Sequence, residues 1–212
     1  EIYTLSLHDA LPIYLGISYM NGLRNPTLYE MFGTDNFGYS GNRDLKPEKS
    51  NTYEIYSNIK FNENLNLTLS AFRSNIENNI EYINNKYQND NDNINLNQSG
   101  FNNHLNFQLN DTSINLFSSF LSSKKENGAD QLRRPEKNYG LNLSQKFHNS
   151  FLGNLNFNFS YNHYGKHFDT HSSNFSTIEM DSTDIIDLKI TKKLNNNYFY
   201  IKVTNALNEN YQ

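Results

Sequence analysis

The feature that most constrains the fold of this chain is an alternation of apolar and polar residues with a period of two. In the stretch LGNLNFNFSYNHYG, the residues Leu155, Phe157, Phe159 and Tyr161 share one parity, and Asn or Ser stands between them. Successive side chains of a β-strand point to opposite faces, so the pattern predicts a strand with one apolar and one polar face. A disordered segment has no reason to keep such a register.

The same alternation recurs along the chain and predicts about nine strands. The first is expected at residues 14–19 and the last at residues 198–208. Five further examples, each identified by its sequence, are LNLTLSAF, HLNFQLN, YGLNLSQKF, IIDLKIT and YFYIKVT.

The connections between these strands alternate in length. Short polar turns are expected at residues 62–64, 110–112, 148–150 and 195–197, and long loops at 21–50, 84–93, 123–133 and 169–180. Short turns at one end and long loops at the other are typical of an outer-membrane barrel whose long loops face outward. The predicted fold class is therefore all-β, a partial antiparallel up-and-down transmembrane β-barrel. Because such barrels must close and bacterial ones use even strand numbers, we expect this one to be incomplete at both ends.

Composition is compatible with this class and excludes several others. The mean hydropathy of −0.79 is low, but only alternate residues of such a barrel meet lipid. No run approaches the roughly 18 apolar residues of a membrane-spanning helix. A net charge of −4 without a basic cluster argues against a nucleic-acid partner, and the absence of Cys excludes disulfides and thiolate metal sites.

Residues 1–13 do not continue this pattern. The segment EIYTLSLHDALPI can be back-translated without a gap to a string that resembles a common short-read sequencing adapter. We therefore predict that residues 1–13 are a non-native segment and that residues 14–212 are the native chain.

Two motifs in the first long loop resemble a known family. RNPTLYEMFG, which begins at Arg24, is followed by GNRDLKPEKSNTYEI, and IKVTNALNENYQ lies near the end of the sequence. In this order and spacing they resemble the loop motifs and the penultimate strand of TonB-dependent outer-membrane receptors. The resemblance implies a C-terminal part of the receptor barrel, located in the bacterial outer membrane. It implies transport rather than an enzyme.

The later half resembles the cobalamin (vitamin B12) receptors of this family. The segments that carry the likeness are LRRPEKNYGLNLS, HYGKHFDTHSS and STDIIDLKIT. The resemblance implies a scarce large ligand, either cobalamin or another metal complex such as an iron siderophore. It also implies contact with outer-membrane lipid and lipopolysaccharide, and with an inner-membrane energy-coupling complex through a plug domain that these residues do not include.

The same resemblance names three candidate ligand-binding residues. Arg133 and Arg134 end a long loop at a place where an arginine of the cobalamin receptors faces the ligand, and His171 in the next loop matches more loosely. A guanidinium presents five donors in a planar fork, which suits phosphate and amide oxygens. The alternative is that both arginines are rim charges that face lipopolysaccharide phosphates.

No other group of residues in the sequence predicts a catalytic set, a metal site or a cofactor. His163 and His167 would stand roughly 13 Å apart on a strand, too far for one ion. Asp90 and Asp92 have the spacing of a calcium loop, but the Gly and Glu that such a loop needs are absent. Aromatic residues near the strand ends suggest interfacial girdles, with the aromatic core of a soluble sandwich as the alternative. A passive porin and a soluble adhesin remain open as alternative functions.

Overall fold

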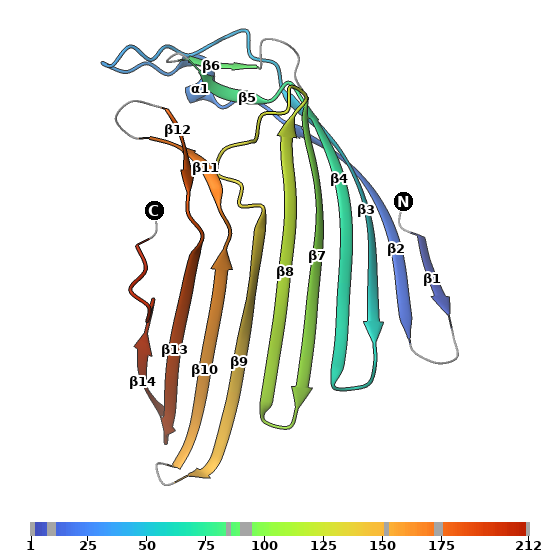
Figure 1. Ribbon diagram of the computed structural model, residues 1–212, viewed down its shortest axis with the longest axis vertical. Coiled ribbons are helices and arrows are strands. Elements are labelled where there is room, and N and C mark those ends of the chain that lie inside the picture. Colours follow the sequence, from blue (N-terminus) through green and yellow to red (C-terminus); the bar gives the residue numbers. More distant parts are fainter. Residues whose placement is uncertain are drawn as a thin grey trace.

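The computed structural model describes residues 3–7, 12–83, 86–89, 95–150, 153–171 and 176–210, which form one large curved sheet with a layer of loops at one end (Figure 1). The main sheet consists of β1 (Tyr3–Leu7), β2 (Ile13–Arg24), β3 (Glu48–Lys60), β4 (Leu65–Glu77), β7 (Leu96–Leu109), β8 (Thr112–Lys125), β9 (Lys137–Ser150), β10 (Gly153–Tyr164), β13 (Thr183–Leu194) and β14 (Asn197–Val203).

The sheet is an open antiparallel meander, which confirms the predicted fold class. Its ten strands follow the order β1-β2-β3-β4-β7-β8-β9-β10-β13-β14. Nine of them are the predicted strands, and β1 is the addition. Residues 14–19 are expected to form the first strand and so an edge of the sheet, but β1 pairs with β2 from Tyr3↔Ile17 to Leu7↔Ile13, so that expectation is wrong for this structure.

The last strand is shorter than predicted. β14 ends at Val203, because Asn205 turns the backbone into the left-handed region at a φ of 50°. Its amide donates to the Asp187 carboxylate at 2.8 Å, and the Ala206 amide donates to the Ile186 carbonyl. The chain therefore stays beside β13 without continuing the ladder.

Tight turns connect the strands at the end opposite the loop layer. Asn110 and Asn195 occupy the left-handed region there, which asparagine tolerates better than most residues. The turn between β9 and β10 comes later than predicted, since residues 148–150 still belong to β9.

All four long connections lie at the other end of the sheet, as an antiparallel meander requires (Figure 1). Three of them carry regular structure that the sequence pattern did not predict. The first contains α1 (Leu28–Phe32), the second contains the hairpin β5 (Ile80–Ile83) and β6 (Lys86–Asn89), and the fourth contains the hairpin β11 (His167–Thr170) and β12 (Thr177–Met180).

The strand pairing gives the sheet one apolar and one polar face. Phe159 pairs with Leu188 and Phe157 with Ile190, while Asn158 pairs with Lys189 between them. Lys202 and Ile201 of β14 continue the polar and the apolar rows. The predicted alternation of faces is therefore confirmed. The apolar face carries Phe157, Phe159, Leu188 and Ile201, and the polar face carries Asn156, Asn158, Asp187, Lys189 and Lys202.

A row of aromatic residues marks the end of the apolar stretch on the apolar face. Tyr19 packs on Tyr53 with ring centroids 4.8 Å apart, Phe101 pairs with Phe120, and Tyr139 lies 6.3 Å from Tyr161. Toward the loops the same face becomes polar, at positions that include Asn51, Arg73, Ser99, Ser122, Lys137 and Asp184. We call the residues Tyr19, Tyr53, Phe101, Phe120, Tyr139 and Tyr161 the aromatic row.

The buried apolar side chains lie at the loop end of the sheet. Among the described residues they are Tyr39, Leu45, Ile80 and Leu96, all in the long connections or at the first residue of a strand. Apart from two short hairpins in the loops, the described residues form no second sheet that could pack on the main one, so the predicted alternative of a soluble sandwich with an aromatic core is wrong. No helix in the described part of the chain is long and apolar enough to span a membrane.

Candidate ligand-binding loop layer

An arginine joins the two sequence motifs of the first long loop. The Arg24 Nε donates to Glu48 Oε2 at 2.9 Å, and its Nη2 lies 3.1 Å from Glu30 Oε1. The side chains of Glu30 and Glu48 are only 10% and 15% exposed, so their charges need this partner. Glu48 also accepts from the Ile80 amide, which ties the loop to β5.

The short helix α1 begins with a capping box. Thr27 Oγ1 accepts from the Glu30 amide, and the Glu30 carboxylate accepts from the Thr27 amide at 2.6 Å. These bonds satisfy amide groups that the first turn of a helix leaves without partners. Pro26, directly before Thr27, has no amide hydrogen to satisfy.

Four tyrosines form a cluster that includes Tyr29 of this helix. Tyr39 is 3% exposed, donates its hydroxyl to the Tyr29 carbonyl at 2.6 Å, and stacks on the Tyr29 ring at 4.9 Å. Tyr82 and Tyr87 of the β5–β6 hairpin lie 5.9 and 5.8 Å from the Tyr39 ring. Burial, followed by the neighbouring Tyr29, raises the pKa of Tyr39 above its ordinary value, so the phenol stays protonated.

Side-chain amides tether the β5–β6 hairpin to the first loop. Asn42 donates to the Tyr87 carbonyl at 3.1 Å, and Asn89 exchanges hydrogen bonds with the backbone of Lys46. On its other side, Glu81 pairs with Lys125 at the end of β8. The first two long connections therefore form one packed unit, with Phe37 exposed on it at 90%.

Arg133 holds the third connection against the fourth. Its backbone lies in the left-handed region at a φ of 59°, and its amide donates to the Phe168 carbonyl of β11 at 2.7 Å. Its Nε donates to Asp169 Oδ1 at 2.7 Å, while the side chain remains 70% exposed. The Arg133 hydrogen bond, followed by one from the Thr170 amide, lowers the pKa of the Asp169 carboxyl.

Arg134 points to a different surface from that of Arg133. It lines a hollow of about 270 Å³ between the third connection and the β11–β12 hairpin, together with Lys166, His167, Phe168 and Glu179. Lys166 in this hollow lies 3.3 Å from both Glu179 and Asp181. Within the described part of the chain Arg134 has no ion pair, so its charge is available at the hollow.

The third candidate, His171, closes the β11–β12 hairpin. Its amide donates to the Ser176 carbonyl at 2.8 Å, and its side chain is half-buried. Arg133 contacts β11 at Asp169, and His171 follows the last residue of that strand. The structure thus places Arg133 and His171 beside β11 and Arg134 in a hollow that β11 residues also line. Figure 1 shows this strand in the loop layer.

The other sequence candidates have local partners. His163 stacks on Tyr139 at 4.3 Å and lies 2.8 Å from Asp184, whereas His167 approaches the Gly165 carbonyl. No group of three or more His, Cys, Asp or Glu among the described residues could hold a metal ion. The predicted loop tip with Asp90 and Asp92 lies outside the described residues.

The tyrosine cluster is the main site feature that the sequence pattern did not predict. Its four members come from two loops without periodicity, and only the excess of Tyr in those loops was visible. Such a layer of exposed aromatic, guanidinium and amide groups is suited to binding a large ligand that carries both apolar and oxygen-bearing surface.

A family model described as "TonB dependent receptor-like, beta-barrel" matches residues 3–208. No curated protein is similar enough in sequence to count as a match.

Solved structures match nearly the whole chain. The copper transporter OprC matches with a TM-score of 0.75 at 13% identity, over 100% of this chain and 33% of its own. The siderophore receptor PirA from Acinetobacter baumannii matches with a TM-score of 0.75 at 16% identity, over 98% and 36%. The ferric-catecholate import receptor Fiu from K12 E. coli matches with a TM-score of 0.68 at 17% identity, over 98% and 30%. The chain spans about a third of the length of these proteins.

Proposed function

The chain belongs to the TonB-dependent receptor β-barrel family, and we propose that it supplies part of the wall and the outer ligand-binding loops of an active-transport receptor. Barrels of this family lie in the bacterial outer membrane, and so does this chain. Its family is one of receptors and transporters rather than enzymes. Family membership also disfavours the passive porin and the soluble adhesin.

One observation carries the binding part of the proposal. Exposed cations stand at the loop end of the sheet on backbone that is held in place. Arg133 is anchored through its amide and Nε yet is 70% exposed, and Arg134 lines the neighbouring hollow without an ion pair in the described chain. Donors that are ordered before binding lose little freedom when a ligand arrives.

The proposed ligand is a large metal complex that carries oxygen acceptors. The receptor PirA is described as a siderophore receptor and Fiu as a ferric-catecholate import receptor, whereas OprC is a copper transporter. Cobalamin is the specific candidate, because its phosphate and amide oxygens match the donors of Arg133 and Arg134. His171, directly after β11, would contact the same ligand.

Two partners complete the proposed function. Lipid and lipopolysaccharide would surround the apolar face, and an inner-membrane energy-coupling complex would act on the receptor through a plug domain. The exposed apolar residues of that face, among them Ile17 at 59% and Ile55 at 53%, are suited to lipid.

The experiment is a binding assay on the intact receptor with two ligands, cobalamin and a ferric siderophore. Arg133→Ala should weaken binding of the true ligand by about 1–3 kcal/mol if a charge-assisted hydrogen bond is lost. Arg73→Ala removes the same residue type from the apolar face of β4, so it is the matched control and should leave affinity unchanged.

Asp169→Asn separates a binding role from a purely structural one. It removes the carboxylate charge beside Arg133, so affinity should stay the same or rise if Arg133 contacts the ligand. If Arg133 only holds β11 in place, Arg133→Ala and Asp169→Asn should weaken binding alike. Unchanged affinity in Arg133→Ala and Arg134→Ala would leave both arginines as rim charges that face lipopolysaccharide phosphates.

A further inference from the structure

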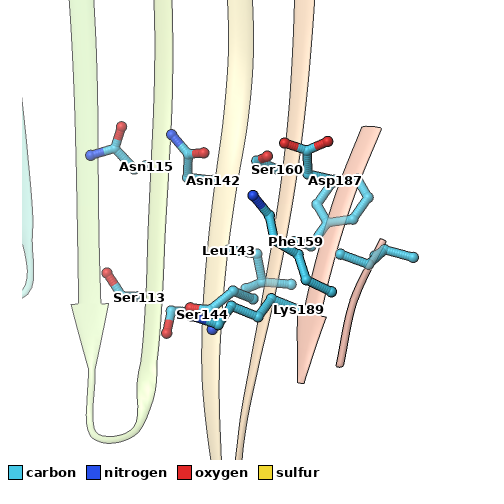
Figure 2. Close-up of a pocket in the computed structure, with 12 residues that line it drawn as sticks. Ser113, Asn115, Asn142, Leu143, Ser144, Phe159, Ser160, Asp187 and Lys189 are labelled. Atoms are coloured by element: carbon cyan, nitrogen blue, oxygen red, sulfur yellow. The ribbon is translucent and has the colours of Figure 1, made fainter. Parts of the chain in front are cut away.

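The polar face of the sheet carries two adjacent rows of polar side chains far from the loop layer. One row crosses five strands through Ser113, Ser144, Asn158, Lys189 and Lys202. The next row, toward the loops, runs through Asn115, Asn142, Ser160 and Asp187 (Figure 2). Both rows line one shallow hollow of about 290 Å³.

The first row ends in two like charges that face each other. Lys189 of β13 is the direct cross-strand partner of Lys202 of β14. Side chains in directly opposite positions of an antiparallel pair lie close together, and like charges there destabilise the sheet. The pairing thus sets two lysines of like charge directly opposite each other, at a cost in stability.

No carboxylate of the described chain forms an ion pair with either lysine. Asp187 stands on the same face one row away, but its Oδ1 accepts from the Asn205 amide at 2.8 Å. The Lys189 ammonium instead lies 4.9 Å from the centre of the Tyr200 ring.

The neighbouring residues add neutral donors to the same hollow. Ser113 and Ser144 carry hydroxyl groups and Asn158 an amide in the row of the lysines, and the Ser144 hydroxyl donates to Asn156 Oδ1 across a long 3.3 Å contact. Two ammonium groups with hydroxyl and amide donors beside them are the complement of an oxyanion, because each oxygen can accept several charge-assisted hydrogen bonds.

We propose that Lys189 and Lys202, with Ser144 and Asn158 beside them, form an oxyanion site on the polar face that takes a carboxylate or a phosphate group. The site lies on the wall away from the loop layer, so it does not depend on the proposed ligand or on Arg133. An anion between the two ammonium groups converts their repulsion into two attractions.

The test uses the full chain refolded in detergent micelles, with inorganic phosphate and a blocked peptide bearing two adjacent glutamates as probes. Acetylation of each lysine by a limiting reagent is followed by mass spectrometry. Both probes should protect Lys189 and Lys202 in a saturable way and leave Lys192 unprotected, because Lys192 stands on the apolar face as the partner of Phe199. The probe that saturates at the lower concentration identifies the source, either free phosphate or a carboxylate of a polypeptide.

Substitutions distinguish the site from nonspecific charge. Lys189→Gln and Lys202→Gln should each weaken binding about tenfold, as expected when one charge-assisted hydrogen bond is lost. Lys192→Gln is the matched control and should bind as the original chain does. Equal protection of all three lysines, or equal binding by the Lys189→Gln, Lys202→Gln double variant, would overturn the proposal.

A charge reversal adds a readout that does not require a ligand. Lys202→Glu should place a carboxylate opposite Lys189, raise the thermal unfolding midpoint of the micelle-bound chain and abolish anion binding. A midpoint that falls, or anion binding that persists, would contradict the inferred repulsion between the two lysines.

Discussion

Arg24 Nε lies 2.9 Å from Glu48 Oε2, and this contact joins the last residue of β2 to the first residue of β3 across the whole first loop. The two sequence motifs that carry the family resemblance thus meet in one ion pair. The motifs have a structural reason to occur together. The first supplies the Arg24 cation, and the second supplies the nearly buried Glu48 carboxylate that this cation neutralises.

Loss of Arg24 should loosen the first loop. Arg24→Leu leaves Glu30 and Glu48 without their shared cation, at a cost on the order of 1–3 kcal/mol. Limited proteolysis should then cut between residues 25 and 47 faster than in the original chain. Arg43→Leu is the control, because that guanidinium only lies over the Phe32 ring at 5.2 Å. Equal cutting rates in the two variants would contradict a special role for Arg24.

The two faces of β10 should respond in opposite ways to a charge. Phe157→Arg places a guanidinium in lipid. For a position near the bilayer midplane, the free energy of folding into lipid should become less favourable by about 2–4 kcal/mol. Asn158→Arg, one residue away on the polar face, should be tolerated. Folding into lipid vesicles, measured by the urea midpoint, compares them. Similar midpoints for both variants would mean that the apolar face does not meet lipid.

The contact between Arg133 and Asp169 should depend on pH in the acid range. Because the pKa of Asp169 is lowered in the folded chain, its stabilisation is complete above the ordinary carboxyl pKa of about 4 and is lost as the pH falls through the lower folded value. The Nε–Hε signal of Arg133 in an NMR titration should move in that range. Asp169→Asn should abolish the movement, and a signal that stays constant down to pH 2 would refute the contact.

Gly140 is required by close packing. A Cβ there would lie 2.5 Å from both Phe117 Cζ and the Tyr161 carbonyl oxygen. Gly140→Ala should therefore destabilise the folded chain by about 1–3 kcal/mol, the usual cost of overpacking. Gly22→Ala is the comparison, since the nearest atom is a Ser50 hydroxyl that can rotate away. Urea unfolding should rank Gly140→Ala as the more harmful change, and the reverse order would show that the Phe117 ring moves freely.

Removal of residues 1–13 tests their origin. The family match begins at residue 3 and β1 pairs with β2, whereas back-translation of the segment favours a non-native origin. We propose that residues 1–13 are non-native, and we expect the shortened chain to keep the same hydrogen-exchange protection in β3 and the strands beyond it. Loss of protection throughout β2 and β3 would show that β1 belongs to the native sheet.

The wall of this structure was predictable because each strand carries its own signal. Alternation in β10 or β13 needs no information from elsewhere, and it assigned Phe159 and Leu188 correctly to one face. The exact strand ends were less predictable. β14 stops at Val203 because of a contact between Asn205 and Asp187, and no local pattern indicates that contact.

The loop layer was much less predictable for the same reason. Tyr39 becomes a buried centre only because Tyr29, Tyr82 and Tyr87 surround it from other segments. Arg133 was recognised through a family resemblance, but its Asp169 partner was not, since that pairing depends on how two loops approach each other.

The aromatic row runs obliquely across the strand pairing. Tyr53 pairs with Arg73, yet the row continues at Phe101, which pairs with Ala71, and later at Tyr139, which pairs with Ser118. A strand displaced by one residue would turn its apolar side chains inward, but a displacement by two would keep them outward. Such a two-residue slip would still carry the aromatic ring out of the membrane interface and a polar residue into hydrocarbon. The oblique row therefore disfavours the two-residue alignment errors that alternation alone would accept.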